Sequence, residues 1–185
     1  MITEKPIKLT RDCDAVMVPS GERAFLTAGS TVWLTQALGG TYTVMTERGY
    51  SARIDGKDGD ALGLASPNDQ SRGEPSDKGA SGSIDELVWN ELRSCFDPEI
   101  PVNIVDLGLI YDCEVRPLAN SGHKAVVRFT LTAQGCGMGQ FLKEDIKKKL
   151  LAVPGVHEAD VELVWDPPWD QSMISSSAKQ QLGIE

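Results

Sequence analysis

Histidine and cysteine, the usual ligands of tightly held metals, are scarce in this sequence. It contains two histidines and four cysteines, and no two cysteines have CxxC spacing. His123 and His157 do not form a metal pair by spacing, and no serine–histidine–aspartate set is evident. A chain of 185 residues does not need a disulfide framework to fold, so reduced thiols are expected.

Long apolar segments are missing too. The N-terminus, from Met1 to Lys5, lacks the apolar core of a signal peptide. No apolar run approaches the length that a membrane-spanning helix needs. The sequence therefore predicts a cytoplasmic protein with no membrane partner.

The chain also lacks an excess of positive charge, because its formal net charge is −9. Most of the acidity lies in residues 83–185, which hold 16 acidic and 9 basic side chains. A surface of this sign repels phosphate groups, so a nucleic-acid partner is not expected. Hydrophobic residues make up 41% of the sequence, which supports packed cores rather than disorder.

Composition divides the chain into four segments. Residues 1–65 are short β-branched and aromatic runs separated by glycine, which predicts a small all-β module. Residues 66–82 are rich in serine, glycine and proline, which is typical of a flexible linker. Residues 83–170 have the periodicity of a second domain, and residues 171–185 are expected to be a polar, partly mobile tail.

The second domain begins with a capping box, in which Ser83 precedes Glu86 by three positions. Five elements are then expected in the order helix, strand, strand, helix, strand, over about residues 84–95, 109–115, 125–132, 138–153 and 159–165. The predicted fold class is α+β, an αββαβ domain behind a small all-β domain. If the last strand pairs in parallel, the second helix must be its crossover connection.

One cysteine lies in a setting that suits reactivity. Cys136 stands between Gly135 and Gly137, just before the second expected helix, with Thr132 four residues earlier. Thr132, Gly135 and Gly137 are expected to line a pocket around its sulfur. A helix N-terminus favours ionisation of a nearby thiol, and a thiolate attacks electrophiles and binds soft metals. Taken alone, a cysteine in a glycine-rich turn is more often inert, so both interpretations stand at this point.

Carboxylates and aromatic residues extend the candidate site. Asp97 and Glu99 could serve as metal ligands or acid–base groups, or could instead cap the loop backbone around Pro98. Asp106 could line the same pocket, but bonding of the loop backbone ahead of Leu107 is the favoured role. Trp165 and Trp169 end a proline-stiffened segment that could dock a partner.

These residues carry a family resemblance that covers about residues 83–170. The matching pieces, in order, are DPEIP at 97–101, DLGLI at 106–110, TAQGC at 132–136 and WDPPW at 165–169. Together they resemble the small domain of the cytosolic iron–sulfur targeting and assembly factors. With the N-terminal β module, the chain looks like the long form of the bacterial SufT-type assembly proteins.

The resemblance implies an αββαβ domain that acts in iron–sulfur protein maturation, with Asp97, Glu99, Thr132 and Cys136 as its site. Many members have a second threonine where this chain has Ala133, and proline where it has Gly137. We therefore expect a non-enzymatic maturation factor that transiently binds iron or a cluster edge. Cys136 would be the main ligand, with Glu99 or Asp97 as oxygen ligands.

The partners implied are scaffold or carrier proteins and client apoproteins. A full cluster needs about four protein ligands, so a homodimer or a client could supply the rest. A metal-free adaptor that docks clients through Trp165 and Trp169 is the main alternative. A phenylacetyl-CoA oxygenase subunit is less favoured, because no cysteine-rich segment follows Trp169. A thiol enzyme using Cys136 lacks an evident histidine base.

Overall fold

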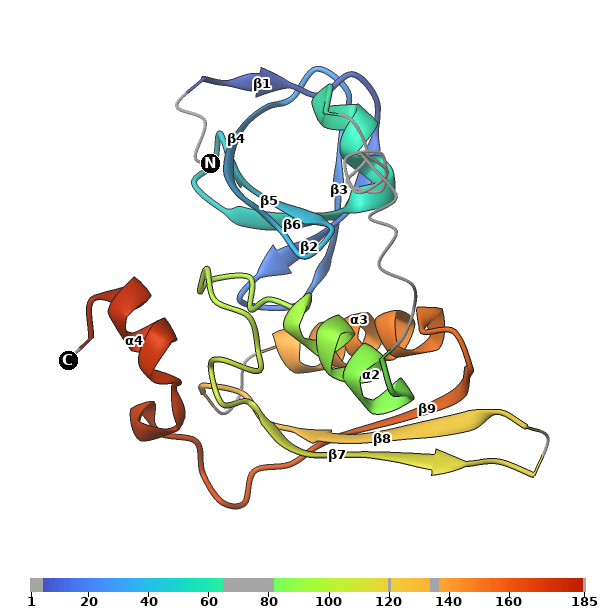
Figure 1. The fold of residues 1–185 in the computed structure, drawn as a ribbon. Helices are drawn as coiled ribbons and strands as arrows, with labels where there is room; N and C mark the ends of the chain where they lie inside the picture. The colour runs from blue at the N-terminus through green and yellow to red at the C-terminus, as the bar shows by residue number, and fades with distance from the viewer. Residues whose placement is uncertain (1–4, 65–81, 120, 134–136, 185) are drawn as a thin grey trace. The chain divides into compact units, whose positions relative to one another are not determined.

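The computed structural model describes residues 5–64, 82–119, 121–133 and 137–184 (Figure 1). The chain divides into two compact units, residues 1–80 and residues 81–185. Both helices and strands are present, so the prediction of a mixed protein is confirmed. Most of the expected linker, residues 66–81, lies outside the described residues. None of the described helices combines the length and hydrophobicity that a membrane span requires.

The first unit is an antiparallel sheet followed by a short 3-10 helix. Its strands lie in the order β1-β4-β5-β6-β2-β3. Their bounds are β1 Ile7–Lys8, β2 Cys13–Val18, β3 Arg23–Leu26, β4 Thr31–Leu38, β5 Thr41–Thr46 and β6 Ser51–Asp55, and η1 is Gly56–Leu62. The β4–β5 hairpin turns through Gly39 and Gly40, which both have positive φ, as a tight two-residue hairpin requires.

The second unit contains α2 (Ile84–Arg93), β7 (Ile110–Pro117), β8 (His123–Phe129), α3 (Met138–Ala152) and β9 (Val156–Leu163) in chain order. Its sheet has the order β7-β8-β9. Strands β7 and β8 pair antiparallel, whereas β8 and β9 pair parallel, so α3 forms the crossover between them. The Ser83–Glu86 capping box is present with both of its hydrogen bonds, which fixes the start of α2.

Helices α2 and α3 cover one face of this three-stranded sheet (Figure 1). The alternation of β8 explains the arrangement, because Ala125, Val127 and Phe129 are fully buried while Arg128 between them is exposed. On α3, Ile146 and Leu150 complete the core from the helix side. The opposite face of the sheet carries the intervening charged residues.

The C-terminal tail contains helical structure that the sequence did not predict. Residues 171–184 contain a 3-10 turn η2 (Gln171–Met173) and a helix α4 (Ser176–Leu182). Ile174 and Ala178 are 5% and 3% exposed and belong to the core of the second unit. Ser175 caps α4 through its hydroxyl, which accepts from the N–H of Ala178. The segment is polar in composition, yet Ile174 and Ala178 are buried and Leu182 and Ile184 are partly buried against the same core.

Candidate functional site

The loop after α2 carries both candidate carboxylates, and the structure gives them different settings. The bridge between Phe96 and Asn103 closes the base of this loop. Asp97 is only 8% exposed, and its Oδ1 accepts a hydrogen bond of 2.9 Å from the N–H of Glu99. The Glu99 side chain, in contrast, is exposed. Asp97 therefore shapes the loop, while Glu99 presents a carboxylate to solvent.

The start of α3 is the second part of the candidate site. Thr132 follows β8 and is half-buried, and Gly137 is exposed as the N-cap of α3 without any side-chain capping bond. The helix start packs closely on the strand ends. A Cβ built on Gly139 would lie 3.0 Å from side-chain atoms of both Leu131 and Leu163. Gly137 itself, which has no side chain, supplies no capping bond to the backbone N–H groups of the first turn.

Gln134, Gly135 and Cys136 lie outside the described residues. The predicted ligand role of Cys136 and the predicted pocket role of Gly135 therefore stay predictions. The structure describes the residues on either side of this gap, which are Thr132 and Ala133 after β8 and Gly137 before α3. Cys136 is the residue that directly precedes the N-cap of α3.

The other three cysteines are buried or half-buried in the two units, which suits packing. Cys13 and Cys95 are buried at 3% and 0% exposure, and Cys113 is half-buried. Burial is the main cause that raises the pKa of the Cys13 thiol. Burial, with smaller contributions from Asp112 and Asp85, raises the pKa of Cys113 to about 11. These two thiols are protonated at neutral pH and poor as ligands or nucleophiles.

A preformed metal cage is absent from the described part of the chain. Across residues 5–64, 82–119, 121–133 and 137–184, no three histidine, cysteine, aspartate or glutamate side chains gather into a group that could hold a metal. The described residues therefore supply isolated oxygen ligands, such as Glu99, rather than a set of several.

Asp106 is bonded on both carboxylate oxygens. Asn103 Nδ2 donates to its Oδ2 at 2.6 Å, and the hydroxyl of Ser175 donates to its Oδ1 at 3.0 Å. The N–H of Ser175 also donates to the Asp106 carbonyl at 2.8 Å. These bonds favour the structural role over the pocket role that Asp106 was also assigned.

Residues 165–184, which we call the C-terminal brace, hold the segment 101–111 in place. Trp169 Nε1 donates to the carbonyl of Leu107 at 2.8 Å, and Gln181 Nε2 donates to that of Pro101 at 3.0 Å. Gly108 has φ +70°, and a Cβ there would lie 2.3 Å from the carbonyl oxygen of Met173. The brace thus fits directly against the backbone that follows the site loop.

The two tryptophans that were predicted to bind a partner have different environments. Trp169 is half-buried and committed to its bond with Leu107. Trp165 is 38% exposed and is one of the few large exposed hydrophobic side chains among the described residues. A docking role therefore remains a prediction for Trp165, while Trp169 has a structural role. Sequence reasoning missed the brace because its bonds join residues about 60 positions apart.

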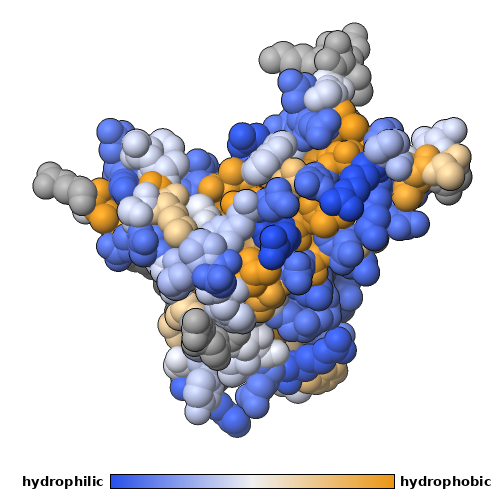
Figure 2. Space-filling view, turned by 90° about the horizontal axis from the view of Figure 1, so that it is seen from below, coloured by the Kyte–Doolittle hydropathy of each residue, from blue (hydrophilic) through white to orange (hydrophobic). Residues whose placement is uncertain are grey.

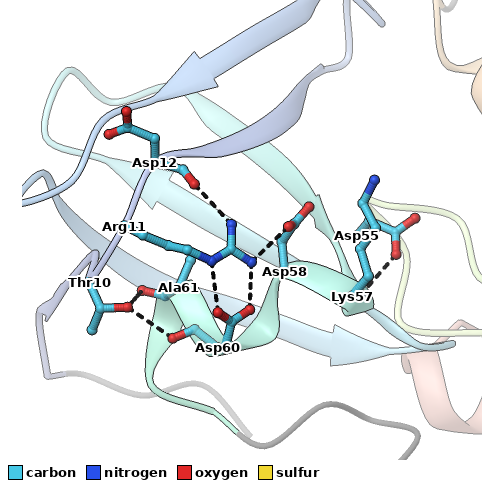
Figure 3. A network of polar contacts seen from close by, with 8 residues as sticks. All are labelled: Thr10, Arg11, Asp12, Asp55, Lys57, Asp58, Asp60 and Ala61. Atoms are coloured by element: carbon cyan, nitrogen blue, oxygen red, sulfur yellow. Dashed lines mark hydrogen bonds and ion pairs between the residues drawn. The ribbon is translucent and has the colours of Figure 1, made fainter.

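In the first unit, one arginine joins two carboxylates within a network of polar contacts (Figure 3). Arg11 donates to both carboxylate oxygens of Asp60, at 2.7 and 2.6 Å, and to Asp58 at 2.9 Å. The hydrogen bond from Arg11 is the main cause that holds the pKa of Asp60 below its usual value. This network ties the start of β2 to η1 and leaves no free carboxylate pair for a metal at Asp58 and Asp60.

Comparison with known proteins identifies the second unit. The model of the family described as "Iron-sulfur cluster assembly protein" matches residues 85–163. A "Fe-S protein maturation auxiliary factor" of Porphyromonas gingivalis is 38% identical over 100 residues, which cover 54% of this chain and 91% of that protein.

Two further relatives have similar names. The factor YitW of Bacillus subtilis is 34% identical over 56% of this chain and 97% of its own length. The factor SufT of Staphylococcus aureus is 38% identical over 48% of this chain and 96% of its own length. Because the chain covers nearly all of these relatives at 34–38% identity, it belongs, through its second unit, to the iron–sulfur cluster assembly protein family.

Proposed function

We propose that this iron–sulfur maturation factor transiently binds iron or a cluster edge through Cys136 and delivers it to client apoproteins. Family membership supports the general role. On this proposal the iron is cargo, and the chain is not an enzyme. Its partners are the scaffold or carrier proteins that load it and the clients that unload it.

The observation that carries the proposal is the place of Cys136 in the sequence, directly before the glycine N-cap of α3. Gly137, the N-cap of α3, has no side-chain capping bond. The N-terminal N–H groups and the helix dipole favour a negative charge there, so they favour the thiolate. Among the described cysteines, Cys13 and Cys113 have raised pKa values. A soft thiolate is the ligand that iron–sulfur chemistry needs.

Weak retention suits a carrier. The described residues contain no preformed group of three ligating side chains, and on this proposal Cys136 binds its iron together with one or two carboxylate ligands from the loop after α2. Glu99 is the better oxygen ligand of the two carboxylates, since its side chain is exposed while Asp97 bonds the loop backbone. Binding by so few ligands favours release to a client, whose own ligands complete the cluster.

The metal-free adaptor remains the second candidate, because Trp165 is exposed at 38% and would offer a docking side chain. The two functions differ in what Cys136 does. A carrier requires its thiolate, whereas an adaptor does not.

The deciding experiment compares Cys136→Ser with Cys113→Ser. Serine keeps the size of the side chain but replaces a soft ligand with a hard hydroxyl. Each purified protein is reconstituted anaerobically with ferrous iron and sulfide, and bound iron is counted. We expect Cys136→Ser to lose the iron and Cys113→Ser to keep it. In a strain without this protein, Cys136→Ser should also fail to restore aconitase-type activity at matched expression. Full rescue by Cys136→Ser would refute the carrier and favour the adaptor.

A further inference from the structure

A cavity of about 660 Å³ lies in the second unit, at the ends of its strands and beside the C-terminal brace. It is lined by Gly108, Ile110, Tyr111, Asp112, Arg128, Val164, Asp166, Pro167 and Met173. Asp112 and Arg128 are opposite each other in the β7–β8 ladder and are exposed, whereas the neighbouring Val127 and Phe129 face the helices. The cavity therefore opens on the sheet face that α2 and α3 leave uncovered.

The lining combines an apolar surface with unbalanced negative charge. Ile110, Val164, Pro167 and Met173 supply the apolar part. The hydroxyl of Tyr111 donates to the carbonyl of Pro167 at 2.8 Å, which fixes the aromatic ring at the cavity wall.

Two carboxylates, those of Asp112 and Asp166, line the cavity together with a single cation, Arg128. The guanidinium of Arg128 is already 3.3 Å from Glu162 on β9. Among the described residues, the side chains of Asp112 and Asp166 take part in no ion pair or hydrogen bond, so both carboxylates are available to an incoming cation.

Acidic side chains also outnumber basic ones over the open face as a whole. Residues that are directly opposite in neighbouring strands point to the same side of a sheet. The pairing therefore puts three basic side chains on this face, Arg116, Lys124 and Arg128, against five acidic ones, Asp112, Glu114, Glu158, Asp160 and Glu162. Ion pairs with Glu114, Glu158, Asp160 and Glu162 engage all three basic groups. Figure 2 shows hydrophobic residues exposed in the middle of the view from below, with hydrophilic residues around them.

We propose that this open face of β7, β8 and β9 docks a basic peptide segment of a partner protein, with an apolar side chain of that segment in the cavity. Phosphate polymers and anionic lipid surfaces are repelled by the acidic rim. A purely apolar partner would leave Asp112 and Asp166 without counter-charges, whereas lysine or arginine flanking an apolar residue satisfies both parts of the site. The inference does not depend on iron binding by Cys136.

The test uses the full chain labelled with nitrogen-15 and three short peptides. The first is rich in lysine and leucine, the second has glutamate in place of each lysine, and the third has serine in place of each leucine. We expect only the first to produce saturable shifts, centred on the amides of Tyr111, Asp112, Arg128 and Val164. Shifts centred elsewhere, or equal shifts with the third peptide, would overturn the docking site.

Two variants distinguish peptide binding at this cavity from non-specific electrostatic attraction to the acidic protein. Asp112→Asn combined with Asp166→Asn removes the two cavity carboxylates, and we expect the dissociation constant of the first peptide to rise about fivefold. Glu144→Gln neutralises an exposed carboxylate on α3 and should leave it unchanged. An equal effect of both changes would show non-specific attraction and refute the proposal. So would concentration-dependent shifts at the cavity without peptide, which would assign the face to a second copy of the chain.

Discussion

Replacement of Gly108 by alanine should loosen the C-terminal brace. The residue has φ +70°, where an L-residue pays about 1–2 kcal/mol. Its new Cβ would also lie 2.3 Å from the carbonyl oxygen of Met173 and 2.8 Å from the carbonyl carbon. Both atoms belong to backbone, so a side-chain rotation cannot relieve the overlap, and the brace must move.

The cost of that movement follows from the bonds that the brace makes. The bond from Trp169 to Leu107 and the bond from Ser175 to Asp106 contribute about 0.5–1.5 kcal/mol each. With the backbone strain, the free energy of unfolding of the second unit should fall by about 3 kcal/mol.

Gly183→Ala is the matched control. Gly183 has φ +69°, but a Cβ there meets nothing within 4 Å, so only the backbone strain of about 1–2 kcal/mol applies. Both variants lie in the same unit and are compared by urea denaturation of the full chain, followed by far-UV circular dichroism. If Gly108→Ala costs no more than Gly183→Ala, the close contact with Met173 does not stabilise the brace and the reasoning fails.

Two further predictions concern titratable groups. Cys136 should react with iodoacetamide faster than Cys113 at pH 7–8, because the pKa of Cys113 is raised to about 11; mass spectrometry measures both rates, and faster labelling of Cys113 would contradict the assignment. Arg11→Ala should destabilise the first unit most at neutral pH. Arg11 lowers the pKa of folded Asp60, so its stabilisation is present above the usual value of 3.8 and is lost as pH falls through the lowered pKa. Denaturation curves of wild type and variant should therefore converge in acid, and a deficit independent of pH would argue against the pair.

Local patterns in the sequence predicted local structure well. The Ser83–Glu86 pair marked the start of α2, and the alternation along β8 separated its buried residues from its exposed ones. The order of α2, β7, β8, α3 and β9 follows from these short-range signals. The bounds differ by a few residues, as β9 begins at Val156, directly after Gly155 with φ +91°.

The brace could not be predicted in the same way. Its residues are mostly polar, and what orders them is a set of acceptors far away in the sequence, such as the Leu107 carbonyl and the Asp106 carboxylate. A pattern within the tail cannot reveal an acceptor about 60 residues earlier. The same limit applies to the two carboxylates of the site loop, because the sequence alone could not show which of them bonds the backbone.

That difference between the carboxylates determines how substitutions in the site loop should be interpreted. Asp97 is nearly buried and bonds the N–H of Glu99, so removal of its charge alters the loop that presents Glu99. Glu99 is exposed, and its own side chain is free to turn toward cargo. A loss of function at Asp97 would thus report the shape of the loop, whereas a loss at Glu99 with an unchanged fold would report ligation. Within the carrier proposal, Glu99 is therefore the oxygen ligand to pair with Cys136, and Asp97 is the residue that positions it.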